Sequence, residues 1–135
     1  MSLVEKIQVI DRRILSDDRG YFLKVLTGKE QFLPSHTGEI YVTSAKPNEA
    51  KGGHYHPKAK EWFTLLQGEC VLKLVDIETG EKLSLSLSST MPQTVYVPNN
   101  IAHIFINASV LEEFLLLAYS DELYDKEDTI YYEFV

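Results

Sequence analysis

Apolar and polar residues alternate along much of this chain with a period of two, more often than they recur at the helical spacing. The clearest example is residues 82–88, KLSLSLS, in which leucine and serine alternate. Successive side chains of a β-strand point to opposite faces, so such alternation is typical of a strand with one buried face. We therefore expect Leu83, Leu85 and Leu87 to face a core while the serines face solvent.

Eight further segments have the composition of short strands: 21–26, 39–45, 61–66, 70–77, 94–97, 103–107, 114–119 and 129–134. The turn-forming stretches DDRG, KPNEAKGG, QGE, ETGE, PNN and SDE separate them. The short QGE turn predicts a hairpin between 61–66 and the strand that starts at Cys70. Many short strands without repeats or linkers predict one all-β domain, a sandwich or barrel, over residues 1–135.

Composition and charge narrow the function classes. The chain has 135 residues, 44% of them hydrophobic, which suits one domain with one core. Its net charge of −7 argues against binding to nucleic acid or to anionic membranes. The sequence has no signal-peptide core and no run of eighteen apolar residues, which predicts a cytoplasmic protein. The single cysteine, Cys70, is expected to be a small buried thiol.

Candidate chemistry is concentrated in residues 53–68, GHYHPKAKEWFTLLQG. In an extended segment, His54 and His56 lie on the same face because they are two residues apart. Glu61 opens the next predicted strand, and His103 opens another after the turn at Pro98. Three imidazoles and one carboxylate suit a divalent transition metal such as zinc, nickel, iron or manganese, with positions left open. The alternative is a set of hydrogen-bonded histidines in a pocket mouth without metal.

The spacing of these residues resembles the two motifs of the cupin superfamily. The pattern H-x-H, four residues, E, six residues, G is met at residues 54–68. The pattern P, four residues, H, three residues, N is met at residues 98–107. The resemblance implies a double-stranded β-helix, or jelly roll, in which His54, His56, Glu61 and His103 bind one metal ion.

Three longer segments, DDRGYF, KGGHYH and SDELYDKEDTIYYEF, are similar to segments of sugar-nucleotide epimerases and ketoisomerases. They also resemble the C-terminal cupin domain of bacterial capsular-polysaccharide enzymes. The resemblance implies proton abstraction beside the ketone of a 4-keto-6-deoxy sugar nucleotide during surface-polysaccharide synthesis. In dehydrorhamnose 3,5-epimerases, the position of His54 carries the general base and that of Tyr124 the acid. Glu133 is the candidate for the acidic residue that supports the base.

Two departures from the dehydrorhamnose epimerases put their metal-free mechanism in doubt. His56 stands in place of a glutamine and Glu61 in place of a lysine, which restores the metal-binding set. A metal-bound imidazole cannot accept a proton at its coordinated nitrogen, so His54 holds only one of its two roles at a time. With metal bound, the base would be Tyr124 or a bound hydroxide; without metal, it would be His54.

The resemblance also implies how the substrate is held and how the chain assembles. Arg19, in the DxRGxF pattern, is expected to bind the nucleotide across a homodimer whose interface includes residues 1–24. Lys51, Lys58 and Lys60 are further candidates for the diphosphate, although lysines are mostly solvated. Trp62 follows Glu61 and should point to the opposite face as a packing residue.

Two other function classes remain open beside the epimerase or ketoisomerase. The first is a different metal-dependent cupin enzyme, an oxygenase or an isomerase of another small molecule. The second is a module that binds a sugar or a metal without catalysis, because one fold hosts many functions.

Overall fold

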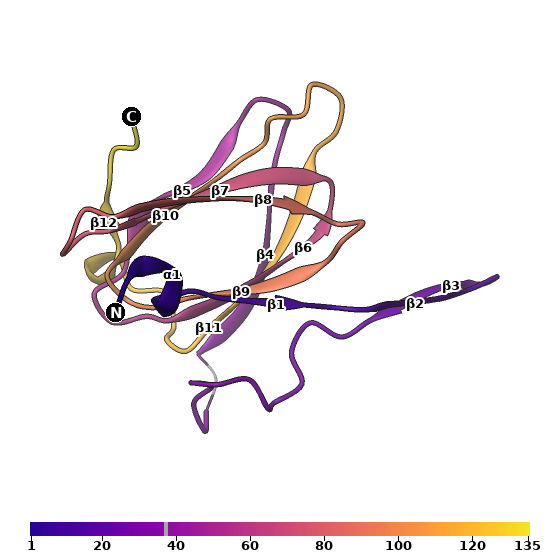
Figure 1. The fold of residues 1–135 in the computed structure, drawn as a ribbon, viewed down its shortest axis with the longest axis horizontal. Helices are drawn as coiled ribbons and strands as arrows, with labels where there is room; N and C mark the ends of the chain where they lie inside the picture. Colours follow the sequence, from indigo (N-terminus) through magenta and orange to yellow (C-terminus); the bar gives the residue numbers. More distant parts are fainter. Residues whose placement is uncertain (37) are drawn as a thin grey trace.

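The chain folds into two five-stranded antiparallel sheets that face each other (Figure 1). This architecture comes from a computed structural model that describes residues 1–36 and 38–135. Its elements are α1 (Leu3–Lys6), β1 (Gln8–Asp11), β2 (Ile14–Asp17), β3 (Gly20–Leu23), β4 (Glu39–Ala45), β5 (Ala50–Tyr55), β6 (Glu61–Gln67), β7 (Glu69–Asp76), β8 (Lys82–Ser88), β9 (Gln93–Val97), β10 (Ile101–Ile106), β11 (Phe114–Ser120), the 3-10 helix η1 (Lys126–Asp128) and β12 (Ile130–Tyr131).

The two sheets enclose one apolar core. One sheet has the strand order β1-β9-β6-β11-β4 and the other the order β12-β5-β10-β7-β8. Their inward faces supply the fully buried core side chains, which include Phe63, Leu72, Leu74, Val95, Phe105, Phe114 and Leu116. The predicted all-β jelly roll is confirmed. Within the described residues, no helix has the length and apolar character needed to cross a membrane.

The alternating leucines and serines lie as predicted. β8 pairs with β7 at the edge of its sheet, and its leucines pack against the core while Ser84 and Ser86 are exposed. Cys70, on β7, is buried in the same core. Burial raises the pKa of its thiol to about 12, so Cys70 is the unreactive buried residue that the sequence predicts.

The predicted hairpin across QGE is wrong. β6 and β7 belong to different sheets, and the turn between them carries the chain from one sheet to the other. Gly68 makes this corner with a φ of 87°, and a Cβ there would lie 3.1 Å from the carbonyl oxygen of Glu113. Glu61, at the start of β6, therefore faces the histidines from the opposite sheet across the interior.

The predicted turn KPNEAKGG is shorter than expected, because residues 50–53 belong to strand β5. Gly52 and Gly53 have positive φ angles of 100° and 83°, and the pairing with β10 shifts register beside them. This irregularity is a β-bulge that glycine makes accessible. Strands β1 and β2 were also not predicted, β3 ends at Leu23, and β12 covers only Ile130–Tyr131.

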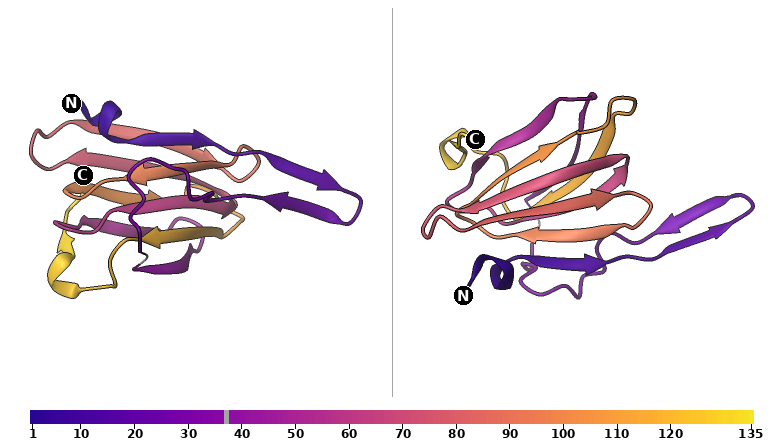
Figure 2. Two further views of the ribbon diagram at one scale, coloured as in Figure 1. Left: turned by 90° about the horizontal axis from the view of Figure 1, so that it is seen from below. Right: turned by 45° about the horizontal axis from the view of Figure 1, so that its top comes forward.

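The hairpin of β2 and β3 projects away from the two sheets in every view (Figures 1 and 2). The segment that follows it returns over the outer face of the first sheet. There, Leu26 and Leu33 pack on an aromatic cluster of Trp62, Tyr96 and Tyr119. Trp62 is thus a packing residue on the face opposite Glu61, as predicted.

The largely buried side chain of Arg12 holds this returning segment against the sheet. Its guanidinium donates to Thr94 Oγ1 at 2.9 Å and to the carbonyl oxygen of Val25 at 3.0 Å. It also pairs with Glu30 at 3.2 Å, and both side chains are largely buried. The segment is therefore a fixed part of the fold.

We expect replacement of Gly52 by alanine to destabilise the fold more than the same change at Gly80. Both glycines have positive φ, which costs alanine roughly 1–3 kcal/mol. A Cβ at Gly52 would in addition lie 2.8 Å from the carbonyl oxygen of His103, whereas a Cβ at Gly80 meets nothing within 4 Å. Urea denaturation measures both free energies of unfolding. Equal losses in the two variants would show that the bulge tolerates a side chain.

Candidate functional site

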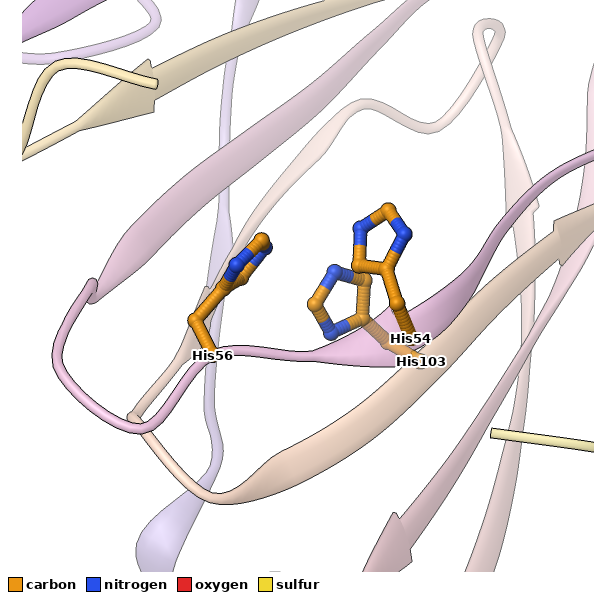
Figure 3. A group of neighbouring side chains, drawn as sticks. All are labelled: His54, His56 and His103. Carbon is orange, nitrogen blue, oxygen red and sulfur yellow. The ribbon is translucent and has the colours of Figure 1, made fainter. Parts of the chain in front are cut away.

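Three histidines from one sheet converge inside the barrel. His54 lies on β5, His56 follows the end of β5, and His103 lies on β10 directly opposite His54. Figure 3 shows that the three rings point toward one another. Their ligand atoms all lie within 4.8 Å of one another, so the three imidazoles can hold a metal ion.

Two of these imidazoles are oriented by backbone carbonyl groups. His56 Nδ1 lies 2.8 Å from the carbonyl oxygen of Asp128, and His103 Nδ1 lies 3.0 Å from that of Ile101. A carbonyl oxygen only accepts, so each Nδ1 donates, and in the neutral ring Nε2 then carries a lone pair. This is the arrangement that metal-binding histidines usually show. No ring hydrogen bond of His54 is found within the described residues.

Glu61 meets two of the histidines across the barrel interior. Its Oε1 lies 3.0 Å from His56 Nε2 and 3.6 Å from His103 Nε2. Its Oε2 accepts a hydrogen bond of 2.6 Å from the hydroxyl of Tyr41. Glu61 is only 3% exposed.

The buried Oε1 of Glu61 has no hydrogen-bond partner within the described part of the chain. A buried carboxylate oxygen is costly unless it meets a donor or a cation. When both rings are neutral, their Nε2 atoms present further lone pairs to Oε1, whereas a protonated His56 would itself supply positive charge. A cation among these atoms would satisfy all of them, so the residues present fit a metal ion.

Burial and neighbouring charges shift the pKa values of the three imidazoles and of Glu61 in different directions. Burial, together with the neighbouring His103 and His56, lowers the pKa of His54 to about 4. Burial also lowers the pKa of His103, despite the nearby Glu61. For His56, burial opposes the charged form, but the Glu61 carboxylate and the Asp128 carbonyl outweigh it and raise the pKa. For Glu61, burial favours the neutral carboxyl, but the neighbouring His56 and His103 outweigh it and lower the pKa.

A cavity of about 270 Å³ opens over this cluster. His54, His56 and Glu61 line it together with Tyr41 and Tyr124. Tyr124 belongs to the loop after β11 and is 71% exposed, so it lies at the mouth of the cavity. The structure therefore brings both predicted catalytic residues, His54 and Tyr124, to one cavity.

The charged side chains around the cavity are acidic. The carboxylates are those of Glu39, Glu61, Glu122, Asp125 and Asp128. Among the described residues, no lysine or arginine lines the cavity. The interior of the cavity thus favours a neutral or cationic group over a phosphate.

The four basic residues predicted to bind substrate lie outside this lining. Arg19 is at the turn of the β2–β3 hairpin, where its exposed guanidinium pairs with Asp17 at 3.2 Å. Lys51 is exposed on β5, and Lys58 is exposed in the loop before β6. Lys60 precedes Glu61, and its backbone N–H donates to Asp121 at 2.8 Å. Their role in substrate binding stays a prediction.

The sequence did not point to two residues of the site, Tyr41 and Asp128. The carboxylate of buried Asp128 accepts from the backbone N–H groups of Lys58 at 2.8 Å and Ala59 at 3.0 Å, while its carbonyl orients His56. Glu133, the candidate for an acidic partner of the base, lies instead in a depression beside Lys73 and Lys82, away from the cavity.

The strand alternation of residues 39–45 places Glu39 and Tyr41 on one face and was a usable signal for Tyr41. The alternation alone does not show which face of β4 turns inward. The pairing of β4 with β11 in the structure shows this. No local pattern separates Asp128 from the other acidic residues of the C-terminal segment.

Comparison with solved structures shows the fold. The crystal structure of the dTDP-6-deoxy-D-glucose-3,5-epimerase RmlC from Legionella pneumophila Philadelphia 1, in complex with dTDP-4-keto-L-rhamnose, is similar with a TM-score of 0.86 and 18% identity. The alignment covers 99% of this chain and 76% of that chain. The capsular polysaccharide assembling protein CapF from Staphylococcus aureus is similar with a TM-score of 0.68 and 22% identity, over 91% of this chain and 33% of that chain.

Comparison of sequences shows the family. A curated relative, the UDP-2-acetamido-2,6-beta-L-arabino-hexul-4-ose reductase of Pseudomonas aeruginosa, is 24% identical over 113 residues. That match covers 84% of this chain but only 28% of the relative. The family model for the polysaccharide biosynthesis C-terminal domain matches residues 15–132. The chain therefore belongs to the polysaccharide biosynthesis C-terminal domain family.

Proposed function

We propose that this chain is a nucleotide-sugar epimerase or ketoisomerase that acts on a 4-keto-6-deoxy sugar nucleotide in surface-polysaccharide synthesis. The observation that carries the proposal is one cavity that joins the buried Glu61 and its histidines to Tyr124. The family of the chain, the fold it shares with a 3,5-epimerase and its resemblance to a sugar-nucleotide reductase support this substrate class.

The reaction requires removal of a hydrogen from the carbon beside the ketone. That hydrogen becomes acidic when a base lies near it and the developing enolate oxygen is stabilised. We place one divalent transition metal, zinc, nickel, iron or manganese, among His54, His56, Glu61 and His103. Such an ion, when bound, polarises a ketone oxygen as a Lewis acid.

Without metal, His54 is the histidine best suited to act as the base. Within the described residues its ring makes no backbone hydrogen bond of the kind that orients His56 and His103, and it lines the cavity. A neutral imidazole has a ring nitrogen able to accept a proton. With metal bound to His54, the base would instead be Tyr124 or a bound hydroxide.

Tyr124 is proposed as the acid that returns a proton to the sugar carbon. Its phenol lines the same cavity from the loop after β11, at the solvent side. A proton donor at the mouth and a base within the cavity can reach a sugar ring from two directions. Inversion of a carbon centre requires such a pair.

The acidic lining favours a diphosphate outside the cavity, because phosphates and carboxylates repel each other. We propose that Arg19, Lys51, Lys58 and Lys60 bind it there. The exposed position of Arg19 on a projecting hairpin suits contact with a second copy of the chain.

We also propose a homodimer. The β2–β3 hairpin exposes Leu15, Tyr21 and Phe22, and an isolated two-stranded hairpin is marginally stable in water. The edge strand β4 exposes Ile40 and Val42 on the outer face of its sheet. A second copy that covers this face and supports the hairpin would bury both apolar surfaces.

The acidic cavity also favours one alternative, a metal-dependent cupin enzyme that acts on a small molecule without phosphate. Oxygen-dependent turnover with bound iron would identify an oxygenase of this kind. Exchange of a sugar hydrogen with solvent would identify the epimerase or ketoisomerase.

The proposed function predicts deuterium incorporation into a 4-keto-6-deoxy nucleotide sugar. The chain is incubated in deuterated water with a panel of dTDP-linked and UDP-linked substrates, and label at C3 or C5 is measured by mass spectrometry and NMR. In a Tyr124→Phe variant, inversion should fall by roughly 10²- to 10⁴-fold while exchange at the base persists.

A Tyr55→Phe variant is the matched control, because Tyr55 lies between the two histidines on β5 and outside the lining of the cavity. It should keep the parental rate. An absence of label with every substrate would reject the epimerase or ketoisomerase. Inversion at the parental rate in Tyr124→Phe would leave the acid unassigned.

The proposed metal site predicts about one divalent transition metal ion per chain after purification without chelator. Replacing His56 with alanine should weaken metal binding by more than about 100-fold. Loss of a residue that only orients a ligand typically lowers metal affinity by about 10- to 100-fold, and loss of the ligand itself should lower it further. Competition with a chromophoric chelator measures the affinity. His36→Ala is the control, since His36 is exposed on the segment over the outer sheet face. Unchanged affinity in His56→Ala would refute the assignment.

The dimer predicts a species of twice the 15.4 kDa chain mass in sedimentation at micromolar concentration. An Ile40→Glu, Val42→Glu double variant should dissociate it, because four carboxylates would then meet at a twofold interface. Ser84→Glu, Ser86→Glu, on the exposed face of β8, is the matched control and should remain dimeric. A monomeric parent would count against this assembly.

A further inference from the structure

Tyr41 lies at the wall of the cavity with its hydroxyl on the buried carboxylate. β4 pairs with β11, and this pairing sets Tyr41 beside Ala118, whose side chain belongs to the core. Tyr41 is 37% exposed, and it lines the same cavity as Glu61. The hydroxyl donates to Glu61 Oε2 at 2.6 Å, a short distance typical of a hydrogen bond to a carboxylate.

This contact makes the two oxygens of Glu61 unequal. Oε2 is satisfied by the phenol, while Oε1 faces His56 and His103 and has no hydrogen-bond partner among the described residues. Without the phenol, the carboxylate could rotate, and both buried oxygens would lack a donor. The hydroxyl of Tyr41 thus holds the carboxylate in the one orientation that directs Oε1 to the imidazoles.

The charge of the pair also favours this role. A carboxylate oxygen only accepts, so in this contact the hydroxyl of Tyr41 is the donor and carries the proton. A phenol that remains protonated adds no charge to the carboxylate. Glu61 therefore keeps its full negative charge for a cation on the other side.

We propose that Tyr41 is a positioning residue for the metal ion, acting through Glu61; this inference rests on the metal site of the proposed function. Partners that orient a metal-binding carboxylate usually contribute 10- to 100-fold to metal affinity. His56 and His103 have such partners in backbone carbonyls, which substitution of a side chain does not remove. Tyr41 contacts Glu61 through its side chain, so a substitution at Tyr41 can test this orienting contact.

The test measures the affinity of the whole chain for Zn²⁺ and Co²⁺ by chelator competition, together with the visible absorption spectrum of the Co²⁺ form. Tyr41→Phe, which removes only the hydroxyl, should weaken binding by roughly 10- to 100-fold and alter the Co²⁺ spectrum. Tyr55→Phe removes a phenol hydroxyl that does not line the cavity, so its metal affinity and spectrum should match those of the parent.

A double-mutant cycle with Glu61→Gln separates positioning from a general loss of structure. If Tyr41 acts through Glu61, then adding Tyr41→Phe to Glu61→Gln should cause no further loss of affinity. Additive losses would overturn the positioning role. Parental affinity in Tyr41→Phe would overturn this inference alone, whereas a parent chain that binds neither ion would overturn the metal site together with it.

Discussion

The site depends on one buried carboxylate that faces the Nε2 atoms of two oriented imidazoles. Glu61 comes from one sheet and the histidines from the other, so the contact joins the two layers of the jelly roll. In the described part of the chain the buried Oε1 of Glu61 has no hydrogen-bond partner, and such an oxygen is costly unless a positive charge, from a metal ion or a protonated His56, meets it. The requirement for positive charge at this point explains why the surrounding residues fit a metal ion.

The rest of the fold keeps these atoms in place. The bulge at Gly52 and Gly53 sets His54 opposite His103. Asp128 contacts two parts of the site: its carboxylate accepts from the backbone of the loop before Glu61, and its carbonyl orients His56. Each of these contacts links segments that are far apart along the chain. The cluster is therefore held by tertiary contacts and does not depend on one local motif.

The cavity above the cluster shows how the ligand can be oriented. Its charged lining is acidic, and the basic residues near the motifs lie outside it. Under the proposed function, a nucleotide sugar would have its sugar inside the cavity and its diphosphate at the surface. In the proposed dimer, the projecting β2–β3 hairpin, which carries Arg19 at its turn, would bring a second copy of the chain to that surface.

The sequence alone determined the strand-rich fold, the inward leucines of β8 and the ligand-type residues at positions 54, 56, 61 and 103, because alternation and motif spacing are local properties. It could not determine which strands share a sheet, and for that reason the turn at Gly68 was misread as a hairpin. Only the tertiary structure brought Tyr41 and Asp128 to the site and left Glu133 outside. Their contacts span 20 residues for Tyr41 and 72 for Asp128, and a contact over such separations depends on strand pairing that a local pattern does not encode.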